Sequence, residues 1–226
     1  MSEGAVLSRA AASEQIAGLG WRLVLGVAQT TIQTGGLREA AETAAAIATA
    51  VGPVADERLL VDIGAAELIL TVRNPHGGML TEAETDLVRR ISQLGGLKPD
   101  PAARGRSVQM LEIAIDAMDI PAILPFWRAA LGYADEPGSK GQPGAIVDPA
   151  GQLPAIWFQQ MDEPRPQRNR IHLDISVPHD EARQRIDATI AAGGVLVSDA
   201  EAPAFWVLAD AEGNEACITT WQGRDA

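Results

Sequence analysis

The residues best suited to bind a metal ion lie at equivalent positions of two similar segments in the second half of the chain. The segments are LEIAID (111–116) and IHLDIS (171–176), about sixty residues apart. Glu112 and His172 occupy the same position in the two copies. A carboxylate and an imidazole together suit a divalent metal such as Zn, Mn, Fe or Ni. The repeat therefore predicts a metal site to which each copy contributes one ligand.

Period-two alternation predicts which side of each strand these ligands occupy. In the second copy one face is apolar and consists of Ile171, Leu173 and Ile175. The opposite face is polar and consists of His172, Asp174 and Ser176. The apolar face of the first copy consists of Leu111, Ile113 and Ile115. We expect the apolar faces to pack under helices and Glu112 and His172 to face each other across a cleft, with Asp174 placed to fix the His172 ring.

The last strand of each copy supplies the remaining candidates. Glu215 and Cys217 share a face in the second copy, and the equivalent face of the first copy carries Trp157 and Gln159. An indole cannot coordinate a metal and an amide oxygen is a weak ligand. A complete set of four ligands is therefore not evident in the sequence.

Two interpretations of the cleft stay open. In the first, Glu112 and His172 hold a metal together with Glu215 or Cys217, and Glu215 is also the candidate catalytic base. In the second, the cleft contains no metal and binds an organic ligand between Trp157 and Trp206. The polar groups that would line such a ligand pocket are Gln159, Asp174 and Cys217.

The elements that must position these residues follow a strand–helix–strand–strand–strand order, twice. We expect helices at 120–131 and 179–192. The expected strands are 108–115, 130–135, 144–148, 154–160, 170–176, 194–198, 204–209 and 214–221. A doubled unit of this kind cannot bury its apolar face alone, so the two copies should share a core.

The first half of the chain predicts an α-β-β-α-β-β-α domain with one antiparallel sheet and helices on one face, so the fold class is α+β. The expected helices are Ser8–Leu19, Leu37–Val51 and Thr81–Leu94. The expected strands are Trp21–Val27, Gln29–Thr34, Leu59–Ile63 and Glu67–Arg73. Thr81 and Glu84 have the spacing of a capping box. The stretch GGLKPDPAARGRS predicts a linker, which gives domains at 1–98 and 108–226 with the linker at 99–107.

Composition limits the classes of partner. The net charge of −12 argues against binding nucleic acid or an anionic membrane. No apolar run is long enough to span a bilayer, and the start of the chain lacks the pattern of a signal peptide. A single cysteine excludes an internal disulfide and favours a cytoplasmic location. The expected partner is a small-molecule ligand or substrate, and the sheet edges permit a homodimer.

The second half resembles the vicinal oxygen chelate superfamily, which includes glyoxalases, bleomycin-resistance proteins and extradiol dioxygenases. The resemblance rests on FWRAALGY (126–133), NRIHLDISVPHDEA (169–182) and DAEGNEACI (210–218), the last being similar to the superfamily's DPxGNxxE. It implies paired βαβββ modules that form an incomplete barrel around a divalent metal. Cys217 stands where that motif has its carboxylate. The implied activity is a metal-dependent lyase, isomerase or dioxygenase; the non-catalytic alternative is a ligand-sequestering protein of the resistance type.

The first half resembles the pterin-4a-carbinolamine dehydratase family through AGLGWRLV (17–24) and GGMLTEAETDLVRRI (77–91). That family's dehydration of a hydroxylated pterin, a lyase reaction, uses histidines as acid–base groups. Its HHP motif aligns with Glu57-Arg58-Leu59 here, and its third histidine falls near Asn74, beside His76. We therefore expect a degenerate domain kept for dimerisation or as a structural partner. The alternative is an active 4a-hydroxytetrahydrobiopterin dehydratase that uses His76 and Glu57.

Overall fold

A computed structural model describes residues 5–103, 108–137, 144–164, 172–220 and 222–223. The chain divides into two compact units, Met1–Met110 and Leu111–Ala226. Each unit has its own cluster of buried apolar side chains.

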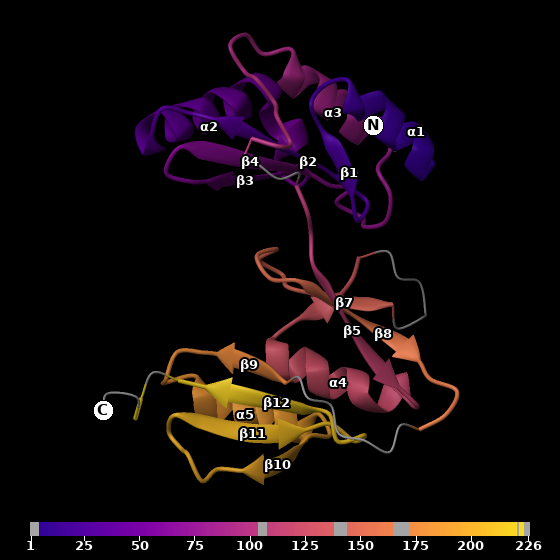
Figure 1. Ribbon diagram of the computed structural model, residues 1–226, viewed down its shortest axis with the longest axis vertical. Coiled ribbons are helices and arrows are strands. Elements are labelled where there is room, and N and C mark those ends of the chain that lie inside the picture. The colour runs from indigo at the N-terminus through magenta and orange to yellow at the C-terminus, as the bar shows by residue number, and fades with distance from the viewer. Residues whose placement is uncertain (1–4, 104–107, 138–143, 165–171, 221, 224–226) are drawn as a thin grey trace. The chain divides into compact units, whose positions relative to one another are not determined.

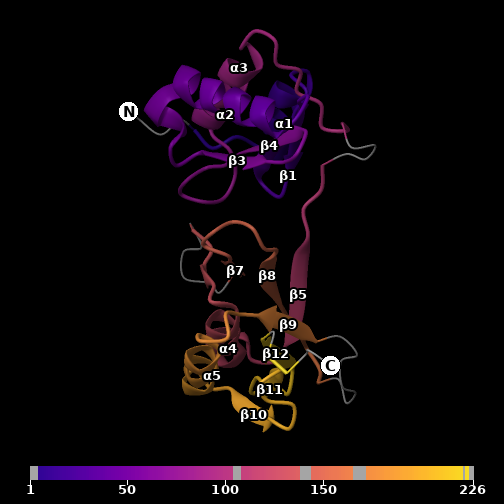
Figure 2. The ribbon, with the colours of Figure 1, turned by 90° about the vertical axis from the view of Figure 1, so that its left-hand side faces the viewer.

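The first unit has the α-β-β-α-β-β-α order that the sequence predicts. Its elements are α1 (Arg9–Ala17), β1 (Arg22–Val24), β2 (Val27–Gln33), α2 (Leu37–Val51), the 3-10 helix η1 (Gly52–Ala55), β3 (Leu59–Ile63), β4 (Glu67–Val72) and α3 (Glu82–Ser92). The strands form one antiparallel sheet in the order β1-β2-β4-β3. The three α-helices lie on one side of this sheet (Figures 1 and 2). The predicted α+β class is confirmed.

Local sequence signals set the ends of these elements. Helix α2 begins after Gly36 and ends at Gly52, whose positive φ of 64° is a conformation that glycine adopts at little cost. Helix α3 begins with the predicted capping box. The Thr81 hydroxyl accepts a hydrogen bond from the first turn, while the Glu84 carboxylate accepts one from the Thr81 backbone N–H.

Part of the predicted linker is folded onto the first unit. Pro99 forms a bridge with Ile32 of β2, and the Asp100 N–H donates to the Thr31 carbonyl at 2.8 Å. The Gln33 side chain also donates to the Ala103 carbonyl at 3.1 Å. Strand β1 pairs only with the first residues of β2, so the rest of that edge is open for these contacts. The sequence predicts a linker here because this stretch lacks hydrophobic periodicity. The contacts that fold it onto the sheet edge are hydrogen bonds to backbone carbonyls, which do not require an apolar pattern.

The second unit repeats one module twice, as predicted. The first module consists of β5 (Glu112–Ala117), α4 (Ile120–Leu131), β6 (Ala134–Asp135), β7 (Ala145–Val147) and β8 (Ala155–Gln160). The second consists of β9 (Leu173–Ser176), α5 (Ala182–Ala191), β10 (Val195–Ser198), β11 (Phe205–Ala209) and β12 (Glu215–Thr219). Their sheets have the equivalent orders β5-β8-β7-β6 and β9-β12-β11-β10, and neither sheet is closed. In each module the first strand pairs in parallel with the last.

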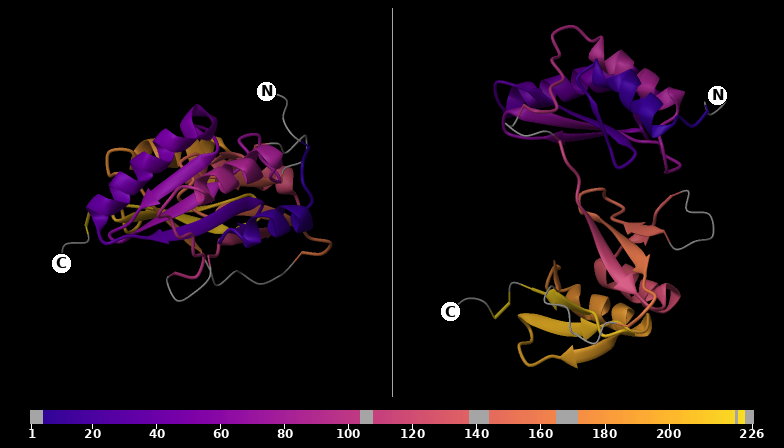
Figure 3. Two further views of the ribbon diagram at one scale, coloured as in Figure 1. Left: turned by 90° about the horizontal axis from the view of Figure 1, so that it is seen from above. Right: turned by 45° about the vertical axis from the view of Figure 1, so that its right-hand side comes forward.

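The two modules share one core. Buried side chains of the first module, including Phe126 and Ile156, belong to the same cluster as Ile186 and Ile218 of the second. Helices α4 and α5 lie side by side, and α5 lies against the sheet of its own module (Figures 2 and 3). In the part of the chain that the structure describes, no helix combines the length and apolar character needed to cross a membrane.

A turn of the second module holds the helix of the first. The Asp210 carboxylate is buried, with an exposed fraction of 3%. It accepts hydrogen bonds from the Trp127 indole N–H (3.0 Å), from the backbone N–H groups of Glu212 and Asn214, and from the Asn214 side chain. The Glu212 carboxylate accepts from the backbone N–H groups of Met118 and Asp119, at the start of α4. We call residues 210–214 the latch turn.

Candidate functional site

Three side chains of types that can bind a metal meet on one face of the second module's sheet. The His172, Asp174 and Cys217 ligand atoms all lie within 4.8 Å of one another. We call these three residues the β9–β12 cluster. Across residues 5–103, 108–137, 144–164, 172–220 and 222–223, no other group of three or more His, Cys, Asp or Glu side chains is close enough to hold a metal ion.

The strand register produces the cluster. Asp174 on β9 lies directly beside Cys217 on β12, so their side chains share a face of the sheet. His172 precedes β9 by one residue, and its Nε2 lies 3.4 Å from the Asp174 Oδ1. Two residues further along, the Ser176 and Thr219 hydroxyls form a 2.8 Å hydrogen bond on the same face. This cross-strand bond is consistent with the parallel pairing of Ser176 with Thr219 and adds to it.

The cluster is open to solvent on one side and buried on the other. His172 and Asp174 are exposed, because β9 is the edge strand of its sheet. Cys217 has an exposed fraction of only 6%, since β12 lies between β9 and β11. A ligand could therefore approach the imidazole and carboxylate from solvent, with the thiol beneath them.

Burial raises the pKa of the Cys217 thiol to about 11, with further contributions from the negative charge of Asp174, from a hydrogen bond with Asp174, and from the charge of Glu215. Each of these effects favours the neutral thiol. The arrangement differs from a nucleophilic cysteine, whose thiolate is stabilised by a neighbouring positive charge. Without a metal, Cys217 is therefore a poor nucleophile at neutral pH.

We expect iodoacetamide to alkylate Cys217 very slowly in metal-free protein, because only the thiolate reacts. A pKa near 11 in place of the usual 9.0 lowers the thiolate fraction at pH 8 by about 100-fold. The alkylation rate, followed by mass spectrometry in EDTA, should still be rising at pH 10. Asp174→Asn should raise the rate at pH 8, because it removes a negative charge beside the thiol. A native rate at pH 8 equal to that of urea-unfolded protein would contradict this expectation.

Glu215 and Glu112, the other predicted acid groups, lie outside the cluster. Glu215 begins β12, two residues before Cys217 and on the same face. Glu112 begins β5 in the first module, where it is exposed and lies beside Ala155 of β8. The repeat places Glu112 and His172 at equivalent positions of the two modules. The three ligand atoms of the β9–β12 cluster, however, all come from the second module.

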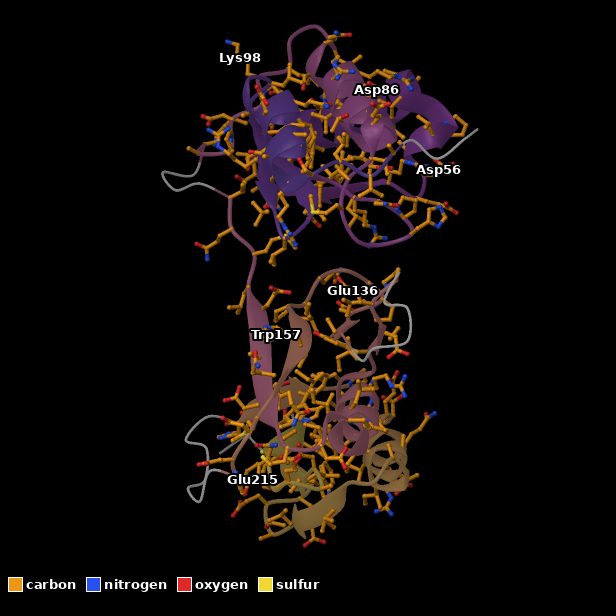
Figure 4. All side chains as sticks on the ribbon, turned by 90° about the vertical axis from the view of Figure 1, so that its right-hand side faces the viewer. Asp56, Asp86, Lys98, Glu136, Trp157 and Glu215 are labelled. Carbon is orange, nitrogen blue, oxygen red and sulfur yellow. The ribbon has the colours of Figure 1, made fainter. Side chains whose placement is uncertain are left out.

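The open face of the first module's sheet carries Trp157 and Gln159. Trp157 is beside Ala114 of β5 and Ala145 of β7, and its exposed fraction is 37%. Gln159 is exposed on the same strand, beside Asp116. Figure 4 shows Trp157 on this sheet and Glu215 on the sheet of the second module.

Trp206 lies on the opposite face of its sheet from the β9–β12 cluster. It is beside Ile218, which is fully buried, and it packs against the core that the two modules share. The neighbour of Cys217 on β11 is Val207 instead. Strand β11 is apolar on both faces, so the sequence alternation does not indicate which face Trp206 occupies.

In the first unit, the predicted acid–base candidates lie at the surface. His76 is exposed in a turn where its backbone N–H donates to the Asn74 side chain at 3.0 Å, and Glu57 is also exposed. Arg58, at the centre of the segment aligned with HHP, forms an ion pair with Glu84, which is 1% exposed. The Nε–Oε1 distance is 2.8 Å. This position therefore serves the capping box of α3.

Comparisons with known proteins agree with the architecture of the second unit. Residues 112–219 match the family described as "Glyoxalase-like domain". A comparison with curated proteins finds no match.

Several solved structures are similar to the chain over about half of its length. One is a glyoxalase/bleomycin resistance protein/dioxygenase family enzyme from Burkholderia phytofirmans PsJN (19% identity; 48% of this chain and 95% of that chain covered; TM-score 0.40). Another is a glyoxalase-related enzyme from Fulvimarina pelagi (20% identity; 50% and 87% covered; TM-score 0.40). A third is a fosfomycin resistance protein from Mesorhizobium loti (8% identity; 49% and 89% covered; TM-score 0.39).

Proposed function

We propose that the glyoxalase-like unit binds a divalent metal through the β9–β12 cluster and acts there on a small organic molecule. The observation that carries this proposal is the meeting of imidazole, carboxylate and thiol ligand atoms within 4.8 Å of one another on one open sheet face. The match of residues 112–219 to a glyoxalase-like domain supports a small-molecule role for the same unit.

The donor set fits Zn²⁺ better than Mg²⁺ or Mn²⁺. Zn²⁺ takes nitrogen and sulfur ligands readily, whereas the harder ions prefer oxygen alone. Three protein ligands leave a fourth position for water or substrate, as in catalytic zinc sites. A cation at this place would also offset the charges of Asp174 and Glu215, which disfavour the Cys217 thiolate.

The residues in and around the cluster would have different chemical roles. A bound metal would polarise a substrate oxygen as a Lewis acid. Glu215 is the proposed proton acceptor, since it lies on the same face as Cys217, two residues away. Asp174 would be a ligand beside His172, whose Nε2 is 3.4 Å from the Asp174 Oδ1.

The first test is the elemental metal content of protein purified without added metal or chelator. We expect near one metal ion per chain, mainly zinc, and its loss in His172→Ala. The matched control is His179→Ala, which removes an exposed histidine of the same unit outside the cluster. Absence of metal from the unmodified protein, even after incubation with Zn, Mn, Fe or Ni, would overturn the proposal. Equal metal loss in both variants would overturn the assignment to His172.

Catalysis and sequestration differ in their products. If the unit is an enzyme, metal-loaded protein incubated with oxygen-rich small molecules should convert them to products that chromatography or NMR resolves from the substrate, and chelation should stop the conversion. A resistance-type protein that only sequesters its ligand would release it chemically unchanged.

We also propose that the first unit is a non-catalytic partner. Arg58 stands at the aligned acid–base position, and its guanidinium pairs with the buried Glu84. Turnover of a hydroxylated tetrahydropterin by the metal-free protein, lost in His76→Ala, would contradict this proposal.

A further inference from the structure

Trp157 lies on a sheet face where its nearest strand neighbours are small, and 37% of its surface is exposed. Its partners on the adjacent strands are Ala114 and Ala145, and the residue two before it on the same strand face is Ala155. A methyl group is too small to cover an indole. Tryptophan is enriched at interfaces where part of the ring packs and part stays accessible.

Two acidic residues lie near Trp157 on the same sheet face. Glu112 and Asp116 lie on β5, two residues before and after the partner Ala114, and so are diagonal neighbours of Trp157 on the same face. At the usual strand spacing and rise, each backbone position is about 8 Å from that of Trp157. None of the strand residues of this sheet (112–117, 134–135, 145–147 and 155–160) is Lys or Arg.

The internal repeat supplies an independent reason to regard this face as a site. By strand register, Trp157 is the equivalent of Cys217, and Ala114 is the equivalent of Asp174. These are positions where the second module gathers its metal-ligating groups. At the cluster-equivalent places the first module has the Trp157 ring and, at the position of His172, the Glu112 carboxylate, which suit a different ligand chemistry.

From these observations we propose that the Trp157 face binds a small organic cation, with a quaternary or alkylated ammonium group against the indole and Glu112 beside it. The negative face of an indole attracts such a cation, and the Glu112 carboxylate adds to that attraction. The inference rests on the proposed small-molecule role of this unit and names its ligand class. It does not depend on a metal in the β9–β12 cluster.

The test compares choline with 3,3-dimethyl-1-butanol, its neutral isostere, using the full chain in EDTA and again with zinc. Proton NMR should show the choline N-methyl signal moving upfield on binding, because the methyl groups lie over the indole ring. Choline should bind at least ten times more tightly than the alcohol, and added salt should weaken its binding.

Two variants locate the site. Trp157→Leu should weaken choline binding at least tenfold and remove the upfield shift, and Glu112→Gln should weaken it several-fold. The matched control is Asp135→Asn, which removes a carboxylate from the opposite face of the same sheet and should leave choline binding unchanged. Equal affinity for choline and the alcohol, or unchanged choline binding by Trp157→Leu, would overturn the inference. Metal content is measured separately, so a failure here is distinguishable from a failure of the metal proposal.

Discussion

Replacing Asp210 with alanine is expected to lower the free energy of unfolding of the second unit by about 3–5 kcal/mol. The buried carboxylate satisfies the Trp127 indole N–H, two backbone N–H groups and the Asn214 side chain. Alanine would leave these donors without an acceptor, and buried donors that lose their partner cost about 1–3 kcal/mol each. Urea unfolding followed by hydrogen-exchange mass spectrometry reports the second unit separately from the first.

The repeat offers a matched control for this prediction. Asp148 occupies the equivalent place in the first module's turn, and its carboxylate accepts from the backbone N–H groups of Ala150, Gln152 and Leu153. Burial opposes the charge of Asp148, but these three donors outweigh it and lower its pKa. Its bonds are local and exposed, so Asp148→Ala should cost only about 1 kcal/mol. Equal losses for the two variants would show that the contact with Trp127 contributes nothing.

Glu84→Ala is expected to destabilise the first unit by about 3–5 kcal/mol, because it removes one partner of a buried ion pair. The Glu84 carboxylate accepts from the Thr81 backbone N–H at 2.8 Å, from the Thr81 hydroxyl at 2.6 Å, and from Arg58 Nε at 2.8 Å. The Arg58 side chain is 22% exposed, so water can compensate part of its charge and the loss should fall toward the lower value. The same unfolding measurement, read on peptides of the first unit, checks this result.

Glu42→Ala provides the comparison for Glu84. Glu42 pairs with Arg38 on the exposed side of α2 at 2.9 Å, four residues apart. Exposed pairs of this spacing contribute about 0.3–0.5 kcal/mol, so little change is expected. Glu84→Gln keeps an acceptor oxygen but loses the charge. Its loss of unfolding free energy should lie between those of Glu84→Ala and Glu42→Ala. A Glu84→Ala loss as small as that of Glu42→Ala would show that burial adds nothing to this pair.

Local signals in the sequence predict much of the fold. Helix α2 has the predicted bounds, Leu37–Val51, because glycines stand on both sides of it. The capping box of Thr81 and Glu84 is confirmed. At the start of β5 the prediction is too long: the strand begins at Glu112, and Leu111 is exposed where the alternation places it on the apolar face. Alternation alone does not show where pairing with a neighbouring strand begins.

The candidate site depends on contacts that a sequence pattern does not contain. Alternation correctly places His172 and Asp174 on one face, but the meeting of Asp174 with Cys217 requires the parallel register of β9 and β12. The only sign of the cluster in the sequence is a histidine and an aspartate two residues apart, His172 and Asp174. The role of Asp210 was also hidden, because a DAEGN sequence indicates a turn but not the helix that the turn contacts. Both the cluster and the Asp210 contact depend on residues far apart in the sequence, which a local pattern does not reveal.

The latch turn has a consequence for folding during synthesis. The backbone N–H groups of Met118 and Asp119, at the start of α4, donate to Glu212, which is 94 and 93 positions further along the chain. The Trp127 indole N–H donates to Asp210, which is 83 positions away. The first module therefore leaves the ribosome long before Asp210 and Glu212 have been synthesised. All residues of the first unit have been synthesised by then. Contacts of such separation slow folding because a long loop must close first. We expect the N-terminal unit to fold co-translationally and the two modules to fold together, after their last strands have left the ribosome.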